Sequence, residues 1–281
     1  MRRGNFENVC AARDRVGAGR LPRQPVFFGA LKQRGRQANR RSGLRTPGEA
    51  FIWWMSTENV RPDDCSRWLE ILDADECQRA DRFRFDHDRT DFIAAHALLR
   101  RMLEFHLRHP AHQWRFVTGE FGKPGIAEQF RLPDIDFNLA HTRGLVAAAL
   151  IDRGKIGIDV EKIDAAKADF QVARNYFAAP EIEILRAVPA SERAVCFFRF
   201  WTLKEAYLKA IGTGLGTPLD SFAFTLAPLG IEFLRGVDDD PRRWQFRTVP
   251  ASAGHVLSVA VAGEKGSRFR FVPRGVDPQD L

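Results

Sequence analysis

The chain has 281 residues and a hydrophobic content of 44%, which is enough for one large core or two smaller lobes. Its formal net charge is +7, but residues 1–48 hold twelve basic and two acidic residues, so they carry +10 and the remainder carries −3. The composition excludes a membrane-spanning chain, since no apolar run approaches ~18–20 residues, and the acidic remainder argues against nucleic-acid binding by the folded part.

Residues 1–48 are rich in Arg, Gly and Gln and have little hydrophobic periodicity. Such a segment cannot bury enough apolar surface to offset its ordering entropy, so we predict a disordered, dispensable tail. Other interpretations stay open: an arginine-rich arm that contacts RNA, an anionic membrane or an acidic protein, a targeting peptide, or a start assigned too far upstream.

The first half of the folded chain, residues 49–151, is predicted to form an α+β lobe. Asp73 or Asp75 is expected to cap a helix, and apolar residues at helical spacing predict a second helix after it. Alternating apolar and polar residues predict a half-buried strand over Ile135–Ala140. The expected strands are Phe51–Met55, Arg115–Thr118, Ile135–Ala140 and Leu145–Ile151, and the expected helices are Cys65–Leu72, Glu76–Arg82 and Thr90–Leu103.

Residues 152–275 repeat this plan and are predicted to form a second, similar lobe. The expected strands are Lys155–Glu161, Phe222–Leu226, Ile231–Leu234, Trp244–Thr248, Val256–Ala262 and Phe269–Val272, and the expected helices are Glu181–Arg186 and Val195–Ile211. The sequence therefore predicts two α+β lobes related by a pseudo-twofold axis, with the active site in the cleft between them.

The strand Lys155–Glu161 places two carboxylates on one face. Its period of two directs Ile156, Ile158 and Val160 into a core and Asp159 and Glu161 to the other side. Neighbouring carboxylates repel each other unless a cation lies between them, and Mg²⁺ prefers such oxygen ligands together with substrate phosphates. We expect Gly157 to leave room for a ligand. A solvated strand end with two surface acids fits this strand equally well.

The helix that ends before Gly212 presents Glu205 and Lys209 four residues apart. Gly212 suits the left-handed residue that ends a helix. A pair at this spacing is most often a surface ion pair, but next to Asp159 and Glu161 it would form a metal site with a spare cation. That chemistry suits transfer of a phosphate-bearing group to an alcohol.

The first lobe offers cations that could bind the phosphates of a donor in one cleft. A solvated arginine or a structural histidine is the ordinary role of each one taken alone. The candidates are Arg79, Arg82, Arg89, Arg100, Lys123 and His141.

Two motifs of the second lobe resemble the paired signature of Sfp-type 4′-phosphopantetheinyl transferases: Gly157-Ile-Asp-Val-Glu161 and Trp201-Thr-Leu-Lys-Glu-Ala-Tyr-Leu-Lys209. Three further segments resemble family elements: Phe137-Asn-Leu-Ala-His141, Gly122-Lys-Pro124 and Thr217-Pro-Leu-Asp-Ser-Phe222. The five elements occur in the family's order, and the resemblance covers roughly residues 51–275. It implies two similar lobes with coenzyme A between them. The implied reaction is transfer of the phosphopantetheine arm to a serine of an acyl or peptidyl carrier protein, which releases 3′,5′-ADP.

The resemblance also implies roles for individual residues. Asp159, Glu161 and Glu205 would bind Mg²⁺, Glu205 would deprotonate the carrier serine, and Lys209 would stabilise the pyrophosphate or the leaving group. Residues after Gly212, through about Phe224, would contact the carrier. The residues implied to contact coenzyme A are Arg79, Arg89, Gly122, Lys123, Pro124, Asn138, His141, Thr142 and Lys204.

The sequence departs from the family pattern at Ala140, where serine is usual, and at Thr142, which is often serine. We expect the missing hydroxyl at position 140 to cost roughly 0.5–1.5 kcal/mol of phosphate binding. Two rival functions remain: another Mg²⁺-dependent phosphoryl-group enzyme, such as a nuclease or phosphatase, and an RNA-binding protein that uses the basic tail.

The four cysteines have no metal-ligand or redox-pair spacing, so free thiols in a reducing cytoplasm are expected. They are Cys10, Cys65, Cys77 and Cys196. The start of the chain lacks the apolar segment of a secretory signal. We therefore expect a cytoplasmic protein without a membrane partner, and a monomer by analogy with the family.

Overall fold

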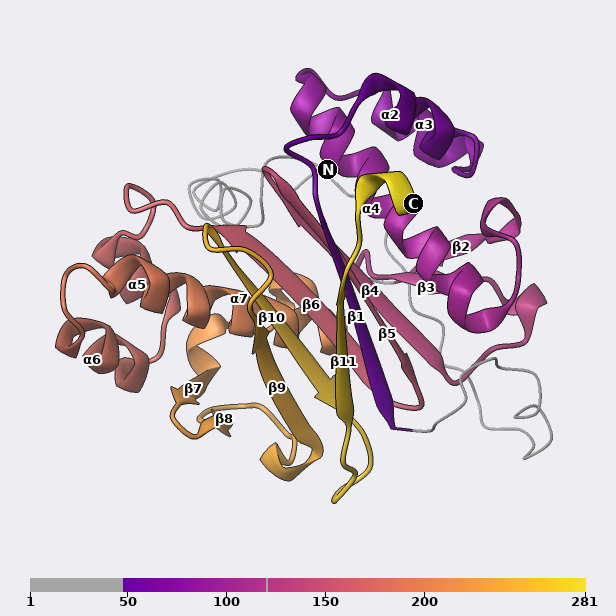
Figure 1. Cartoon of the computed structure of the whole chain (residues 1–281). Coiled ribbons are helices and arrows are strands. Elements are labelled where there is room, and N and C mark those ends of the chain that lie inside the picture. The colour runs from indigo at the N-terminus through magenta and orange to yellow at the C-terminus, as the bar shows by residue number, and fades with distance from the viewer. Residues whose placement is uncertain (1–47, 120) are drawn as a thin grey trace, which may run out of the picture.

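The structure is a computed structural model, and it describes residues 48–119 and 121–281 (Figure 1). The predicted tail, residues 1–48, lies outside the described residues except for Gly48, so its disorder stays a prediction. Two groups of helices stand on either side of a set of long strands, and the chain is α+β as predicted. Within the described residues, no helix combines the length and apolar composition needed to cross a bilayer.

The first lobe contains a four-stranded sheet with three helices. Its strands are β1 (Glu49–Ser56), β4 (Ile135–Thr142), β5 (Leu145–Asp152) and β11 (Arg270–Gly275), in the order β11-β1-β5-β4. Its helices are α2 (Pro62–Leu69), α3 (Ala74–Ala80) and α4 (Asp86–Leu107). A separate hairpin consists of β2 (Phe116–Thr118) and β3 (Pro124–Ile126). Neighbouring strands of the sheet are antiparallel, except that β11 runs parallel to β1.

The second lobe is built in a similar way around an antiparallel three-stranded sheet. Its strands are β6 (Lys155–Lys162), β9 (Trp244–Val249) and β10 (His255–Ala262), in the order β6-β10-β9. Its helices are α5 (Phe170–Tyr176), α6 (Ala179–Ala187) and α7 (Arg193–Ile211). A second hairpin consists of β7 (Phe222–Leu226) and β8 (Leu229–Phe233).

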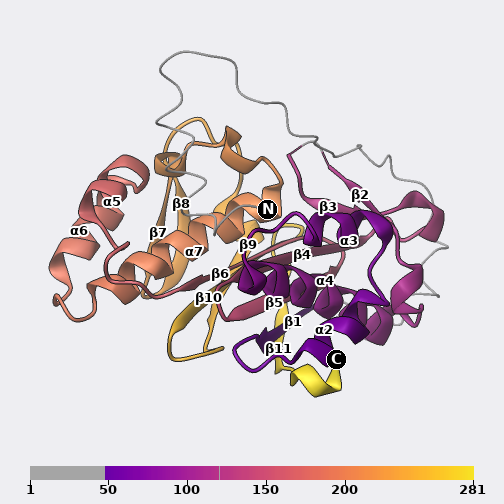
Figure 2. The ribbon, with the colours of Figure 1, turned by 90° about the horizontal axis from the view of Figure 1, so that it is seen from above.

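Each lobe has one long helix that packs on its sheet: α4 on β4 and β5, and α7 on β6 and β10 (Figure 2). The structure confirms two predicted helix ends, the start of α3 and the end of α7. Asp73 caps α3 and exchanges 3.0 Å hydrogen bonds with Glu76, which is a capping box. Gly212 follows α7 with a φ of 73°, in the left-handed region where glycine is favoured.

Three clusters of buried apolar side chains hold the fold together. One joins α4 to the first sheet, and another surrounds α7 in the second lobe. The third lies between the two sheets and contains Ile156, Ile158 and Val160, so the predicted inward face of this strand is confirmed. Because its members come from both sheets, the third cluster ties the lobes together.

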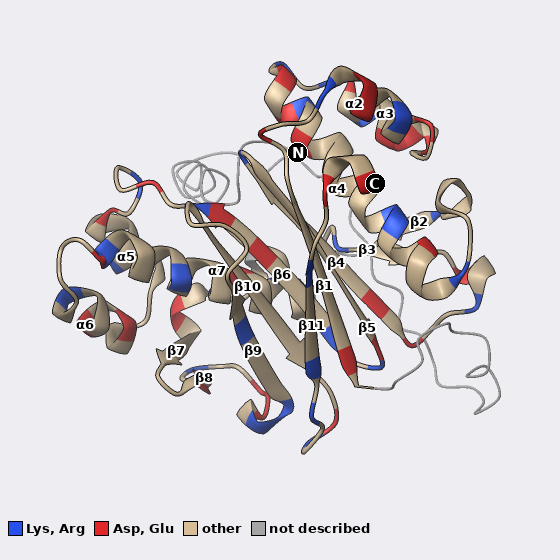
Figure 3. Cartoon of the chain, in the orientation of Figure 1, with Lys and Arg blue, Asp and Glu red and all other residues tan. Residues whose placement is uncertain are grey.

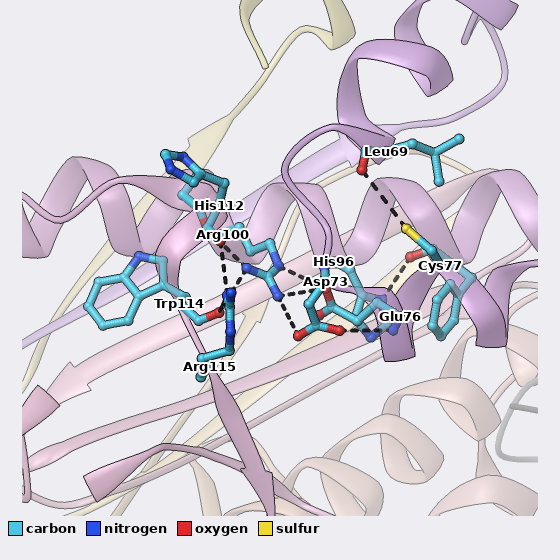
Figure 4. Close-up of polar contacts among 11 residues, drawn as sticks. Leu69, Asp73, Glu76, Cys77, His96, Arg100, His112, Trp114 and Arg115 are labelled. Atoms are coloured by element: carbon cyan, nitrogen blue, oxygen red, sulfur yellow. Dashed lines mark hydrogen bonds and ion pairs between the residues drawn. The ribbon is translucent and has the colours of Figure 1, made fainter. Parts of the chain in front are cut away.

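Arg100 of α4 is completely buried, so it cannot bind a phosphate as proposed from the sequence. Its guanidinium donates to the carboxylates of Asp73 and Glu76, each at 2.9 Å (Figure 4). It also donates to the main-chain carbonyls of Ala111 and Trp114, at 2.9 and 3.2 Å. A buried charge needs such partners, and these contacts tie the start of α3 to α4 and to the segment before β2.

Three elements differ from the sequence prediction. Helix α5 and strand β3 were not expected, and β11, which was expected in the second lobe, pairs with β1 in the first sheet. The second lobe therefore ends with β10, and the chain then returns to the first lobe, where Leu281 packs in the core. A pairing between strands so distant in sequence leaves no local pattern, because each strand shows only its own periodicity.

Candidate active site

Helix α7 lies directly against strand β6, and Gly157 makes this contact possible. A Cβ atom at Gly157 would lie 2.0 Å from the carbonyl oxygen of Ala206 and 2.4 Å from the amide nitrogen of Ala210. Both are backbone atoms of α7. The space that we expected a ligand to use is therefore filled by the helix, and this corrects the interpretation of Gly157.

The close contact brings four predicted residues of β6 and α7 together. Lys209 Nζ lies 2.6 Å from Oδ1 of Asp159, although 50 positions separate them. The carboxylates of Asp159, Glu161 and Glu205 are near enough to act on one another electrostatically. All three residues are buried, with 1%, 6% and 7% of their surface exposed. Figure 3 shows the acidic positions along β6.

Burial and mutual repulsion disfavour the charged forms of these carboxylates. Burial, with the charge of Asp159 as the next cause, raises the pKa of Glu161 to about 8 and that of Glu205 to about 7. Lys209 acts in the opposite direction on both pKa values but does not cancel the rise. An additional cation bound between these carboxylates would favour their charged forms and lower the pKa values again.

The Glu205 carboxylate is only partly satisfied within this group. Oε1 of Glu205 is buried and makes no hydrogen bond in the described part of the chain. Among the described residues, no group of three or more His, Cys, Asp or Glu side chains is arranged to hold a metal ion as it stands. In this arrangement it is Lys209 that neutralises Asp159. The donor set of three carboxylates nevertheless fits a hard cation such as Mg²⁺.

We predict that these two carboxyl groups make the ligand-free protein lose stability as the pH rises from about 4.5 to about 8. The folded state holds the protons of Glu161 and Glu205 up to pKa values of about 8 and 7, whereas the unfolded state releases them near the ordinary value of 4.5. The unfolded state then binds fewer protons, so unfolding becomes easier with rising pH. Thermal denaturation without divalent ions measures this fall, which should be shallower in Glu205→Gln. A melting temperature that rises across this range contradicts the prediction.

His141 lies near enough to Lys209 to be affected by its charge, and Arg79 lies near His96 of the first lobe. Burial, followed by the charge of Lys209, lowers the pKa of His141 to about 4, so the imidazole is neutral at neutral pH in the ligand-free protein. Burial lowers the pKa of His96 to about 3, and Arg79 and His141 both contribute to this shift. His96 is therefore near both Arg79 and His141. The guanidinium of Arg79 lies 5.1 Å from the ring centre of Phe92.

The other predicted cations of the first lobe are occupied. Arg89 forms a 3.1 Å ion pair with Asp81. Lys123 is buried and donates to Oδ2 of Asp136 at 2.5 Å and to the carbonyl of Ile156 at 2.9 Å. Burial lowers the pKa of this lysine, and Asp136 opposes the shift. Arg82 is exposed and donates a hydrogen bond to Gln78. Gly122 lies in the turn of the β2–β3 hairpin with a φ of 89°, and Pro124 begins β3.

Asn138, Ala140 and Thr142 belong to a strand that packs against β6. Oδ1 of Asn138 accepts a 2.9 Å hydrogen bond from the amide of Ile158. Thr142 Oγ1 lies 3.4 Å from Oε2 of Glu161, to which it can donate. Ala140 is 4% exposed and belongs to the apolar cluster between the sheets. The predicted cost of Ala140 to phosphate binding is therefore unsupported, because no phosphate can reach a side chain in that position.

Lys204 corrects a further prediction, since its ammonium group lies in the core of the second lobe. It donates to the carbonyls of Leu219 and Phe222, at 2.7 and 2.8 Å, and forms a 2.8 Å ion pair with Glu181. The lysine is 1% exposed and the glutamate is fully buried. An ammonium group has three protons to donate, and all three have acceptors here, so Lys204 is not available to coenzyme A.

Lys204→Met should destabilise the fold by about 3–5 kcal/mol, because it leaves the Glu181 carboxylate buried without its cation. The affinity of the folded fraction for coenzyme A should not change. Denaturant unfolding measures the first quantity and titration calorimetry the second. Lys265→Met is a matched control, since that lysine is exposed. If the variant has normal stability but binds coenzyme A weakly, the prediction is wrong and Lys204 contributes to the coenzyme A site.

Two carboxylates with structural contacts were not predicted from the sequence: Asp136, which is partly buried, and Glu181, which is fully buried. Asp136 accepts from Lys123 and from the amide of Ile156, and its place two residues before Asn138 on the same strand was the available signal. Glu181 accepts from the amides of Ala178 and Phe224 as well as from Lys204. Its place in the first turn of a helix behind a proline was visible, but nothing local indicated burial.

A cavity of about 990 Å³ opens beside Glu161 between the lobes. The first lobe contributes the segment after β1, the start of α4 and the β4–β5 turn, and the second lobe contributes the end of β6 and part of α7. Its lining includes Thr57, Asp91, Thr142, Glu161, Lys162 and Phe198. One member of the carboxylate group is thus accessible from a space large enough for a substrate.

The comparisons with known proteins match both lobes. Residues 155–260 match the family described as the 4′-phosphopantetheinyl transferase superfamily, and residues 57–151 match 4′-phosphopantetheinyl transferase, N-terminal. The chain is 33% identical over 192 residues to the 4′-phosphopantetheinyl transferase HetI of Nostoc sp., with 68% of this chain and 79% of the relative covered. It is 28% identical over 200 residues to the 4′-phosphopantetheinyl transferase Sfp of Bacillus subtilis, with 71% and 86% covered. It is 27% identical over 256 residues to the human L-aminoadipate-semialdehyde dehydrogenase-phosphopantetheinyl transferase, with 81% and 82% covered.

Proposed function

The chain belongs to the 4′-phosphopantetheinyl transferase superfamily and transfers the phosphopantetheine group to carrier proteins, and from this premise we propose its donor, its metal and its catalytic residues. The proposed donor is coenzyme A, and the proposed acceptor is the hydroxyl of a serine on an acyl or peptidyl carrier protein. The proposed setting is the cytoplasm, with the enzyme acting as a monomer. The rival functions, a nuclease or phosphatase and an RNA-binding protein, have no support among the matched families.

The observation that supports this proposal best is the meeting of Asp159, Glu161, Glu205 and Lys209 in one buried group. We propose that the three carboxylates bind Mg²⁺, because the partnerless Oε1 of Glu205 and the gathering of three carboxyl groups provide the oxygen ligands that this cation prefers. When bound, Mg²⁺ would neutralise phosphate oxygens of the donor. Arg79 and His141, on the facing lobe, are proposed to hold other phosphates of coenzyme A.

The proposed reaction assigns one task to each residue. Glu205 accepts the proton of the carrier serine. The serine oxygen forms a bond to the phosphorus that carries pantetheine, and the bond from that phosphorus to the 3′,5′-ADP oxygen breaks. Lys209 donates hydrogen bonds to the negative charge that develops on the phosphate oxygens. To do so, its ammonium group must leave Asp159, which it contacts in the ligand-free structure.

The test of the proposed function is a mass measurement on an apo carrier protein incubated with the enzyme, coenzyme A and Mg²⁺. We expect the carrier to gain the mass of one phosphopantetheine group, and to gain nothing when coenzyme A is left out or EDTA is added. Transfer that proceeds in EDTA would overturn the metal proposal and leave the transferase intact. Mg²⁺ alone should also raise the melting temperature of the wild-type protein, and raise it less in Glu205→Gln.

Lys209→Ala should lower kcat by about 10²-fold, because one charged donor to the developing negative charge is lost. The dissociation constant of coenzyme A should change much less, since Lys209 acts mainly after substrate binding. Single-turnover kinetics and calorimetry separate the two quantities. Arg186→Ala is a suitable control, because that arginine is exposed and pairs with the exposed Glu183 on α6. Weak coenzyme A binding at an unchanged kcat would assign Lys209 to ground-state binding.

A further inference from the structure

Strands β4 and β6 lie side by side, although each is the edge strand of a different sheet. Side chains of β4 accept hydrogen bonds from backbone amides of β6 at three points. Asp136 Oδ2 accepts from Ile156 at 2.8 Å, and Asn138 Oδ1 accepts from Ile158 at 2.9 Å. Thr142 Oγ1 accepts from the amide of Lys162 at 3.4 Å. We call these three contacts the inter-lobe ladder.

The inter-lobe ladder has a constant register. In each contact the β6 residue follows its β4 partner by twenty positions, so the contacts advance in parallel along both strands. On its other side β6 pairs along its whole length with β10. An amide buried at a sheet edge needs an acceptor, and the ladder supplies acceptors from the other lobe.

The end of the ladder at Asp136 is fixed more firmly than the rest. Lys123 donates both to the Asp136 carboxylate and to the carbonyl of Ile156. The backbone of Ile156 is therefore held at its amide and at its carbonyl by two side chains of the first lobe. Lys123, which resemblance assigned to coenzyme A, contributes in this structure to the position of β6.

The register places Ala140 opposite Val160, in the gap between the Asn138 and Thr142 contacts. A methyl group cannot accept a hydrogen bond, so the ladder has no contact at this step. Val160 stands between Asp159 and Glu161. The missing contact therefore falls on the part of β6 that carries two of the three proposed metal ligands.

We propose that Asp136, Asn138 and Thr142 are positioning residues that set β6 in register with β4. Ala140 leaves the inter-lobe ladder without one hydrogen bond, at the step next to Asp159 and Glu161. The proposal rests on the proposed function, which requires the phosphate-binding side of β4 and the carboxylates of β6 to act on one substrate. His141 is carried by β4 and the two carboxylates by β6, so the ladder sets their relative position. A displacement of ~1 Å in such a site can cost 10²-fold in rate.

The test adds the missing contact and removes an existing one. Ala140→Ser should raise the melting temperature of the ligand-free protein by about 2–4 °C, as one additional buried hydrogen bond would in a protein of this size. Ala148→Ser is the matched control: it places the same hydroxyl in the first-lobe core, away from β6, and should lower the melting temperature.

Asn138→Leu should lower kcat by about tenfold while KM for the carrier stays within about twofold. The double variant Asn138→Leu/Ala140→Ser should recover part of the lost kcat, because the added contact acts on the same stretch of β6. If Asn138→Leu does not fold, the pair Thr142→Val and Thr142→Ser serves instead. The first removes the hydroxyl at constant shape and should lower kcat, and the second keeps the hydroxyl and should restore it.

Two results would overturn the proposal. If Ala140→Ser lowers the melting temperature as much as Ala148→Ser does, position 140 offers no open contact. If folded Asn138→Leu loses stability but keeps its kcat, the ladder stabilises the fold without positioning the site. A wild-type protein that does not modify any carrier would instead refute the proposed function, and the melting temperatures would still decide whether the ladder lacks a contact at Ala140.

Discussion

Glu205→Gln is expected to lower the rate of phosphopantetheine transfer by at least ~10³-fold, because one substitution removes both the proposed base and a proposed metal ligand. The amide has nearly the shape of the carboxylate, so the packing of α7 against β6 should survive. The folded state should not suffer, since burial already disfavours the charged carboxylate, whose pKa is raised to about 7. At pH 8 the variant should melt at the wild-type temperature or above it.

The measurement pairs single-turnover transfer to an apo carrier with thermal denaturation of the same preparation. Glu183→Gln is the matched control, because it makes the same change on an exposed turn of α6. A folded Glu205→Gln protein with turnover within tenfold of the wild type would refute both assignments of Glu205. If activity is lost but Mg²⁺ still stabilises the variant as strongly as the wild type, Glu205 acts as a base and not as a metal ligand.

Gly157→Ala is expected to abolish transfer through geometry alone. The added methyl group would overlap the backbone of α7, since the nearest atoms are a carbonyl oxygen at 2.0 Å and an amide nitrogen at 2.4 Å. The helix must then move away from β6, and Glu205 and Lys209 move with it. Forcing extra volume into a packed core typically costs about 1–3 kcal/mol, and backbone atoms yield less readily than side chains.

Gly125→Ala is the matched control for this prediction. The nearest atoms to a Cβ at Gly125 lie 3.9 Å away, in ordinary contact, so this alanine should leave rate and stability nearly unchanged. Transfer rates and melting temperatures of the two variants form the measurement. Near-normal transfer by Gly157→Ala would mean that the site tolerates a shift of α7, and that the contact between helix and strand does not set its geometry.

The parts of the site that the sequence predicts are those governed by local periodicity. The period of two in β6 places Asp159 and Glu161 on the side opposite Ile158, and the structure agrees because that side packs on a helix. Helical spacing predicts that Glu205 and Lys209 share a stripe. Both patterns depend on neighbours within a few positions, so a single sequence carries them.

Contacts between distant elements were not predictable in the same way. Lys204 and Glu205 are adjacent in α7 but point to different surroundings, and the helix is buried on both sides. Sequence spacing cannot show that Lys204 forms an ion pair with a buried carboxylate from another helix, that of Glu181. The same limit applies to Asn138, whose partner on β6 lies in the other lobe.

The parallel pairing of β1 with β11 has a consequence for synthesis on the ribosome. The strand that completes the first sheet, Arg270–Gly275, is made after β6 through β10, which leave the ribosome earlier as one continuous stretch. The second lobe can therefore close while the first still lacks an edge strand. Until translation reaches β11, the nascent chain exposes the unpaired edge of β1, which is the kind of surface that chaperones protect from aggregation.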